Sequence, residues 1–237
     1  MEDLVCTTFQ ATKESCVLTS LGYAFNYIAN VQRLKAPNVE EVFLSYIEYY
    51  RKTHKDNGLS GKKLIDWARD KAFSKKNFPK DSKKIENMYN PAYNFEHIGN
   101  SSIELLSTIM LHWVCQFENK EINNGTGKRG YDEIIDFWNF CKTDVKFKDL
   151  LANVEIGGHK TSLNENYTSE VAQHLSSGDA LGIALYPLDG AGHSILVYRA
   201  GDEYIARNPT KKSVEVIDIE SLEIREYIIF HISKSHN

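Results

Sequence analysis

The chain has 237 residues and a formal net charge of -4, with 42% hydrophobic and 25% charged residues. This composition is ordinary for a soluble globular protein, and the chain is long enough to bury a sizeable core. The mild negative charge argues against a general nucleic-acid binder, whose surface would be basic. No apolar run approaches the roughly 20 residues that span a bilayer, so we expect no membrane partner.

The start of the chain and its cysteines bear on location. The segment Met1–Leu4 has two acidic side chains and lacks the basic start and apolar core of a classical secretory signal. The four cysteines, Cys6, Cys16, Cys115 and Cys141, form no CxxC pair and no zinc-like spacing with the histidines. Reduced thiols in the cytoplasm are the default expectation, and secretion as an effector without a classical signal is also compatible with the sequence.

The first two-thirds of the chain is predicted to be mainly helical. Apolar residues recur at helical spacing from Cys16 to about Gln32. A second helix is predicted after Pro37, with Asn38 as its cap and Glu41 three residues later. Further helices are predicted from Ser60, from Ser101 and near residues 131–141.

After about residue 165 the pattern changes to short apolar segments bounded by turn residues. A short helix over Thr168–Ser177 is expected to end at Gly178. Strands are then predicted at residues 180–186, 194–200, 203–208, 213–219 and 224–232. The sequence therefore predicts a helical N-terminal part and a strand-rich C-terminal part, with a cleft where they meet.

Two residues near the N-terminus suggest an activated thiol. Cys16 opens the first predicted helix, where unpaired backbone N–H groups and the helix dipole favour the thiolate, the nucleophilic form. Gln10 lies six residues earlier, and its side-chain amide could donate a hydrogen bond to a developing oxyanion. A nucleophilic cysteine also needs a base and a group that orients the base.

His193 is the predicted base. It follows a glycine-rich approach that includes Gly192, and it begins an apolar strand. If residues 201–202 form a compact Gly-first turn, Ala200 pairs with Glu203 and Asn208 lies opposite Ile195. Asn208 then projects to the same face as His193, one diagonal step away. Its carbonyl could fix the imidazole tautomer and leave the other ring nitrogen for Cys16.

The order of these site residues along the chain, Gln, Cys, His and Asn, resembles that of the papain-like cysteine peptidases. In that family a glutamine precedes the cysteine by six residues, as Gln10 and Cys16 do here. The cysteine opens the long helix of the first lobe, the histidine begins a strand of the second lobe, and the asparagine ends the next strand. Asn57 and Gly58, which precede a predicted helix, resemble the glycine-containing segment that lines the family's substrate cleft.

The resemblance implies an α+β fold of the papain-like two-lobe type. Residues 1–237 would form a single domain, with a mainly helical lobe over approximately 1–165 and an antiparallel β-sheet lobe over approximately 166–237, and the active-site cleft between them. Because Cys16 lies close to Met1, we expect no inhibitory pro-segment ahead of it and a compact, divergent, microbial-type member of the family.

The resemblance also implies a thiol protease that hydrolyses a peptide or protein substrate. Cys16 would be the nucleophile, His193 the base and Asn208 the orienting group, with Gln10 and the Cys16 backbone N–H forming the oxyanion hole. Asn57, Gly58 and Gly192 would line the substrate site. This chemistry requires no metal or organic cofactor, and the sequence does not give the oligomeric state.

The chain departs from the family in two segments. The usual Cys-Gly-Ser-Cys-Trp is here Lys13–Val17, which keeps only the serine and the cysteine, and the usual Ser-Trp-Gly after the asparagine is Pro209–Lys211. An aromatic shield over the His–Asn bond is therefore absent or comes from elsewhere. Two alternatives stay open: a papain-fold acyltransferase or deamidase acting on protein side chains, and a catalytically inactive peptide-binding module.

Overall fold

The structure is a computed structural model, and it describes residues 16–37, 41–42, 45–46, 48–49, 130–161, 165–188, 191–211 and 213–233. Within these ranges it combines helices with a six-stranded sheet, which confirms the predicted α+β class. The strand order is β1-β6-β2-β3-β4-β5, and every neighbouring pair is antiparallel. None of the helices in the described part has both the length and the apolar character that a membrane crossing requires.

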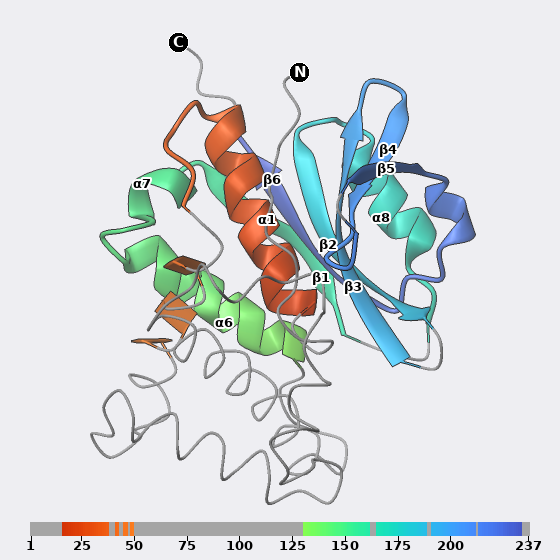
Figure 1. The fold of residues 1–237 in the computed structure, drawn as a ribbon, viewed down its shortest axis with the longest axis horizontal. Helices are drawn as coiled ribbons and strands as arrows, with labels where there is room; N and C mark the ends of the chain where they lie inside the picture. The colour runs from red at the N-terminus through yellow and green to blue at the C-terminus, as the bar shows by residue number, and fades with distance from the viewer. Residues whose placement is uncertain are drawn as a thin grey trace, which may run out of the picture.

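The elements follow one another along the chain in the order shown by the colours of Figure 1. The helices are α1 (Cys16–Val31), α6 (Gly130–Thr143), α7 (Lys148–Leu151), α8 (Thr168–Leu175) and the 3-10 turn η2 (Ile219–Ser221). The strands are β1 (Val154–Lys160), β2 (Ala180–Leu188), β3 (Ala191–Ala200), β4 (Glu203–Arg207), β5 (Val214–Ile217) and β6 (Glu226–Ile232). Residues 41–42, 45–46 and 48–49 are also helical, where the helix after Pro37 was predicted.

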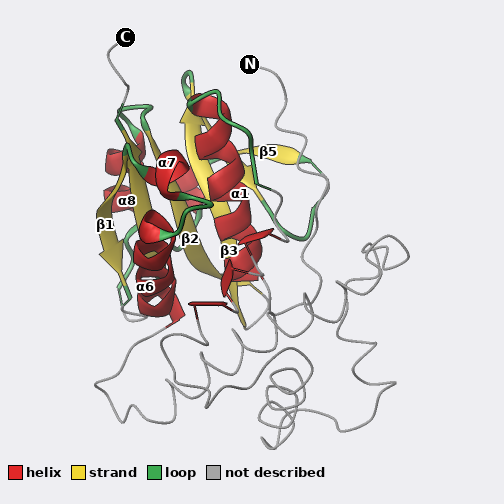
Figure 2. Ribbon diagram, turned by 90° about the vertical axis from the view of Figure 1, so that its left-hand side faces the viewer, coloured by secondary structure: helices red, strands yellow, loops and turns green. Residues whose placement is uncertain are grey.

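Helices cover both faces of the sheet. α1, α6 and α7 pack on one face and α8 packs on the other, as Figures 1 and 2 show. Alternate residues of β3 therefore enter different cores: Leu196 packs with the α1 side, whereas Ile195 and Val197 pack with the α8 side. A strand that is buried on both faces needs apolar residues at successive positions, which explains the apolar run Tyr227–Phe230 within β6.

The hairpin of β3 and β4 has the predicted register. Ala200 pairs with Glu203 and Leu196 with Arg207, so the connecting turn contains only Gly201 and Asp202. Gly201 has φ +64°, a left-handed conformation that glycine adopts without a steric penalty. The turn is therefore of the predicted Gly-first kind, and the prediction of which side chains share a face with His193 follows from it.

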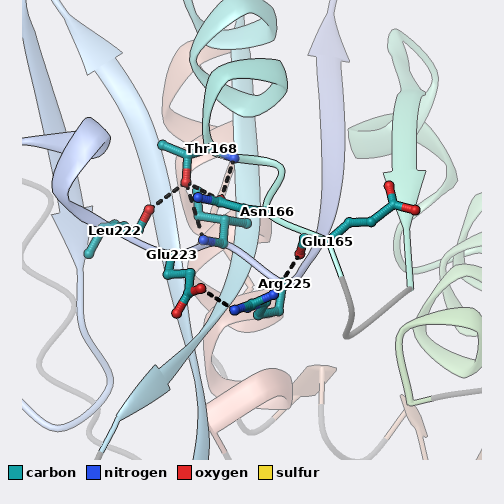
Figure 3. Close-up of polar contacts among 7 residues, drawn as sticks. Glu165, Asn166, Thr168, Leu222, Glu223 and Arg225 are labelled. Carbon is teal, nitrogen blue, oxygen red and sulfur yellow. Dashed lines mark hydrogen bonds and ion pairs between the residues drawn. The ribbon is translucent and has the colours of Figure 1, made fainter.

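The start of α8 is fixed to the chain between η2 and β6 by a buried threonine (Figure 3). The Thr168 hydroxyl lies within hydrogen-bonding distance of Asn166 Oδ1 and the Leu222 carbonyl, and it accepts from the Ile224 backbone N–H at 3.3 Å. The Asn166 side chain also accepts from the Thr168 backbone N–H at 3.1 Å, which satisfies one of the open donors of the helix start. The position of α8 on the sheet is thus set from its first residue.

The sheet contains one strand that the sequence did not predict. β1 lies before residue 165, in the part that was predicted to be mainly helical, and it pairs with β6 at one edge of the sheet. The register of this pair shifts between Ile156 and Gly158, so Gly157 is an extra residue in β1. Two adjacent glycines and this bulge hide the strand pattern in the sequence. The helices predicted from Ser60 and from Ser101 lie outside the described residues.

Candidate functional site

His193 and Asn208 meet across the β3–β4 hairpin. His193 lies near the start of β3, and Asn208 follows the last residue of β4. His193 Nε2 and Asn208 Oδ1 are 2.8 Å apart, a hydrogen-bonding distance between two buried side chains. This contact was predicted from the two-residue turn, because continuing the ladder beyond Arg207 places Asn208 opposite Ile195 and diagonal to His193.

The Asn208 side chain is also held in place by Thr210, independently of its contact with His193. Its Oδ1 also accepts from the Thr210 backbone N–H at 3.0 Å and from the Thr210 hydroxyl at 2.8 Å. Because a backbone N–H can only donate, these bonds identify the atom as the amide oxygen rather than the nitrogen. His193 Nε2 must therefore carry the proton that it shares with Asn208, and the neutral ring keeps its lone pair on Nδ1.

The surroundings of His193 favour its neutral form. Its side chain is 7% exposed, and this burial lowers its pKa, while the hydrogen bond with Asn208 raises the pKa in part. The net direction is downward from the ordinary value. At neutral pH the ring is therefore a proton acceptor at Nδ1, which is the state that a general base requires.

Cys16 is the first residue of α1, and this helix packs against β3 and β2. One turn further along α1, the Ser20 hydroxyl donates to the Ser194 carbonyl at 3.2 Å. Ser194 follows His193 directly, and a helix rises about 1.5 Å per residue, so Cys16 lies about 6 Å along the axis from this contact. The start of α1 and the start of β3 thus lie at the same end of the sheet. The first turn of α1 has no acidic side chain to oppose a thiolate.

Two tyrosines near the beginning of β3 lie within electrostatic reach of Cys16. The Tyr131 hydroxyl of α6 hydrogen-bonds the Ser194 side chain. Burial is the largest cause that raises the Tyr131 pKa well above its usual value; the Ser194 bond lowers this pKa, and the charges of Glu226 and Cys16 raise it. The Tyr186 ring of β2 lies 5.8 Å from the His193 ring at 80°, in an edge-to-face arrangement. These side chains surround the end of the sheet at which His193 is located.

Tyr186 is also within electrostatic reach of Cys16. Burial is the largest cause of its raised pKa; Lys211 lowers this pKa, and Glu215 and Cys16 raise it. Sequence reasoning missed Tyr131 and Tyr186. The signal for Tyr186 was its place in β2 directly opposite His193, but this pairing depends on a turn whose length the sequence does not reveal.

The predicted site residues therefore have three different outcomes. The structure brings His193 and Asn208 into contact and places Cys16 at the same end of the sheet. Gly192 lies in β3, where it pairs with Pro187 of β2, and its substrate role stays a prediction. Gln10, Asn57 and Gly58 lie outside the described residues.

The arrangement contains a thiol, an imidazole and an amide, which are kinds of group that acyl-transfer chemistry uses. Cys16 is 6% exposed and is not in a disulfide. His193 offers an oriented ring with a lone pair, and Asn208 fixes its tautomer. Among the residues that the structure describes, no three His, Cys, Asp or Glu side chains gather as metal ligands. No protein-family model, curated protein or solved structure matches this chain.

Proposed function

We propose that this protein is a cysteine peptidase of papain-like two-lobe architecture that hydrolyses peptide bonds. The observation that carries the proposal is the 2.8 Å hydrogen bond between His193 Nε2 and Asn208 Oδ1, formed at the end of the sheet where Cys16 begins α1. An asparagine that fixes the tautomer of a buried neutral histidine leaves Nδ1 as the base. The supporting arrangement is that the start of α1, which carries the thiol, lies at the same end of the sheet as the start of β3.

The proposed reaction has two stages. His193 Nδ1 takes the proton of the Cys16 thiol, and the thiolate attacks the substrate carbonyl carbon. The Cys16 backbone N–H and the Gln10 amide stabilise the oxyanion, and the imidazolium then gives its proton to the leaving amine. Water attacks the resulting thioester after losing a proton to His193, which releases the carboxylic acid and restores the thiol.

Tyr186 takes the place of the aromatic residue that is absent after Asn208. Its ring meets the His193 ring edge to face and excludes water from one side of the imidazole. In a drier setting the bond from His193 to Asn208 is stronger, because its electrostatic attraction is less screened. Tyr186 thus supports the orientation of the ring in this proposal, and Asn57, Gly58 and Gly192 would line the substrate cleft.

Selective alkylation tests the activated thiol. Iodoacetamide should modify Cys16 at neutral pH faster than any other cysteine, with the site read by mass spectrometry. His193→Ala should slow this modification by about tenfold or more, because the thiol keeps its proton. His159→Ala removes an exposed histidine of β1 and serves as the matched control, with no change expected. Equal labelling of Cys16 in all three proteins would overturn the proposal.

Burial of the thiol favours a second candidate. At 6% exposure Cys16 offers little surface to a substrate carbonyl, as expected for a catalytically inactive module that holds a peptide. A library of protein-derived peptides separates the two functions. A peptidase cleaves peptides, and Cys16→Ala abolishes the cleavage, whereas a binding module retains intact peptides with and without this substitution.

A further inference from the structure

A pair of histidines lies on the face of the sheet that α8 covers, at the opposite end of β2 from His193. His174 belongs to α8 and His231 to β6, and both side chains are half-buried. His231 pairs with Ala180 at the start of β2, whereas His193 pairs with Tyr186 near the end of that strand. Six residues of a strand span about 20 Å, so the histidine pair is separate from the proposed catalytic site.

The distance between the two rings suits metal ligands. His231 Nε2 and His174 Nδ1 face one another at 3.5 Å, and the ring centroids are 5.7 Å apart. This separation is longer than the roughly 2.7–3.2 Å of an ordinary hydrogen bond from N–H. Two imidazole nitrogens bound at about 2.0–2.1 Å to a tetrahedral ion lie about 3.3–3.4 Å apart. The nitrogens are therefore close to the spacing that a shared ion requires.

Two glycines of β1 make room for the rings. A Cβ atom on Gly157 would lie 1.9 Å from His231 Cδ2, so no other residue fits beside that ring as it stands. A Cβ atom on Gly158 would lie 3.0 Å from His174 Nε2. The bulge at Gly157 is the place where β1 leaves its register with β6. The local shape of β1 thus forms a recess for this histidine pair.

Charge and anchoring also favour a cation here. Glu170 lies one turn before His174 on α8, and its carboxylate accepts from the Tyr227 hydroxyl at 2.5 Å. The Tyr227 ring is in turn 6.3 Å from the His174 ring. A carboxylate on the same helix face lowers the cost of bringing a cation to the pair. The buried Thr168 bonds fix α8 on the sheet, so the two rings are held by rigid elements.

We propose that His174 and His231 form a binding site for a divalent transition-metal ion of the class that prefers imidazole, such as Ni²⁺, Cu²⁺ or Zn²⁺. The part of the chain that the structure describes offers no third His, Cys, Asp or Glu ligand, so water completes the coordination. The site has no part in the proposed hydrolysis. It ties α8 to β6 at the far end of the sheet.

Titration of the full chain with Ni²⁺, after treatment with a chelator, tests the proposal. Calorimetry should show a site that His174→Gln and His231→Gln each weaken by roughly tenfold or more, since each removes one of two ligands. Combining the two substitutions should weaken it little further. His159→Gln is the matched control, because His159 is an exposed histidine of the adjacent strand β1, and it should leave the affinity unchanged.

Two further measurements test the proposal even if a histidine variant fails to fold. Gly158→Ala keeps both ligands but displaces the His174 ring, so it should also weaken Ni²⁺ binding while circular dichroism stays unchanged. In the unaltered protein, bound Cu²⁺ should show magnetic coupling to two imidazole nitrogens. Ni²⁺ affinity that is the same in all variants, a loss as large in His159→Gln, or a Cu²⁺ spectrum without this coupling would overturn the proposal.

Discussion

The substitution Asn208→Ala should weaken both the fold and the orientation of His193. It removes the acceptor at 2.8 Å from His193 Nε2 and the acceptor of both Thr210 bonds. A buried donor left without a partner costs about 1–3 kcal/mol, and the loss of each part-buried turn bond costs about 0.5–1.5 kcal/mol. We therefore expect the free energy of unfolding to fall by roughly 2–6 kcal/mol, measured by urea denaturation at pH 7.5.

The same substitution should change the titration of His193. The Asn208 bond raises the His193 pKa, so its loss should lower that pKa further, which NMR of the ring protons can follow. Asn208→Asp is the matched variant: a carboxylate accepts the same bonds, and its charge should raise the His193 pKa instead. A stability change below about 0.5 kcal/mol in Asn208→Ala, with an unchanged His193 pKa, would refute the role of the asparagine.

Two other predictions concern residues at the same end of the sheet. Burial lowers the folded-state pKa of His193 below its unfolded value near 6.5, so the unfolded state binds the proton more readily, and the stabilising contribution present above that pH should be lost as the pH falls. Urea denaturation from pH 7.5 to 5 should therefore show a smaller loss of stability in His193→Gln than in the unaltered protein. An identical dependence of stability on pH in the two proteins would contradict the assignment. Tyr131→Phe removes the buried hydroxyl that bonds Ser194 and should destabilise the fold by about 1–3 kcal/mol, measured by thermal or urea unfolding. In the double variant, Ser194→Ala should add little to this loss, and additive effects of the two substitutions would argue against a direct bond.

The parts of the site that depend on contacts close together in the chain could be predicted from the sequence. The two-residue turn at Gly201 and Asp202 sets the register of β3 and β4, and the register in turn places Asn208 beside His193. The helix over residues 16–31 could also be predicted, because its apolar residues recur at helical spacing. These inferences need only the period of a strand, the period of a helix and the geometry of a short turn.

The parts that depend on distant contacts could not be predicted. Tyr186 reaches His193 through the pairing of β2 with β3, and Tyr131 reaches Ser194 through the packing of α6, and neither contact leaves a pattern in the sequence. β1 was missed because Gly157 and Gly158 have low strand propensity and belong to a bulge. The strand forms because it pairs with β6, which is a tertiary effect.

The hairpin that joins β3 to β4 has a consequence for the order of events during folding. His193 and Asn208 are 15 residues apart in the chain, so their contact closes a short loop and can form early. Ser20 and Ser194, whose bond brings α1 to the same hairpin, are 174 residues apart. During synthesis the helix that carries Cys16 emerges long before the hairpin does. In the proposed mechanism, the thiol therefore meets its base only when the sheet is nearly complete, and a partly made chain would carry an unactivated cysteine.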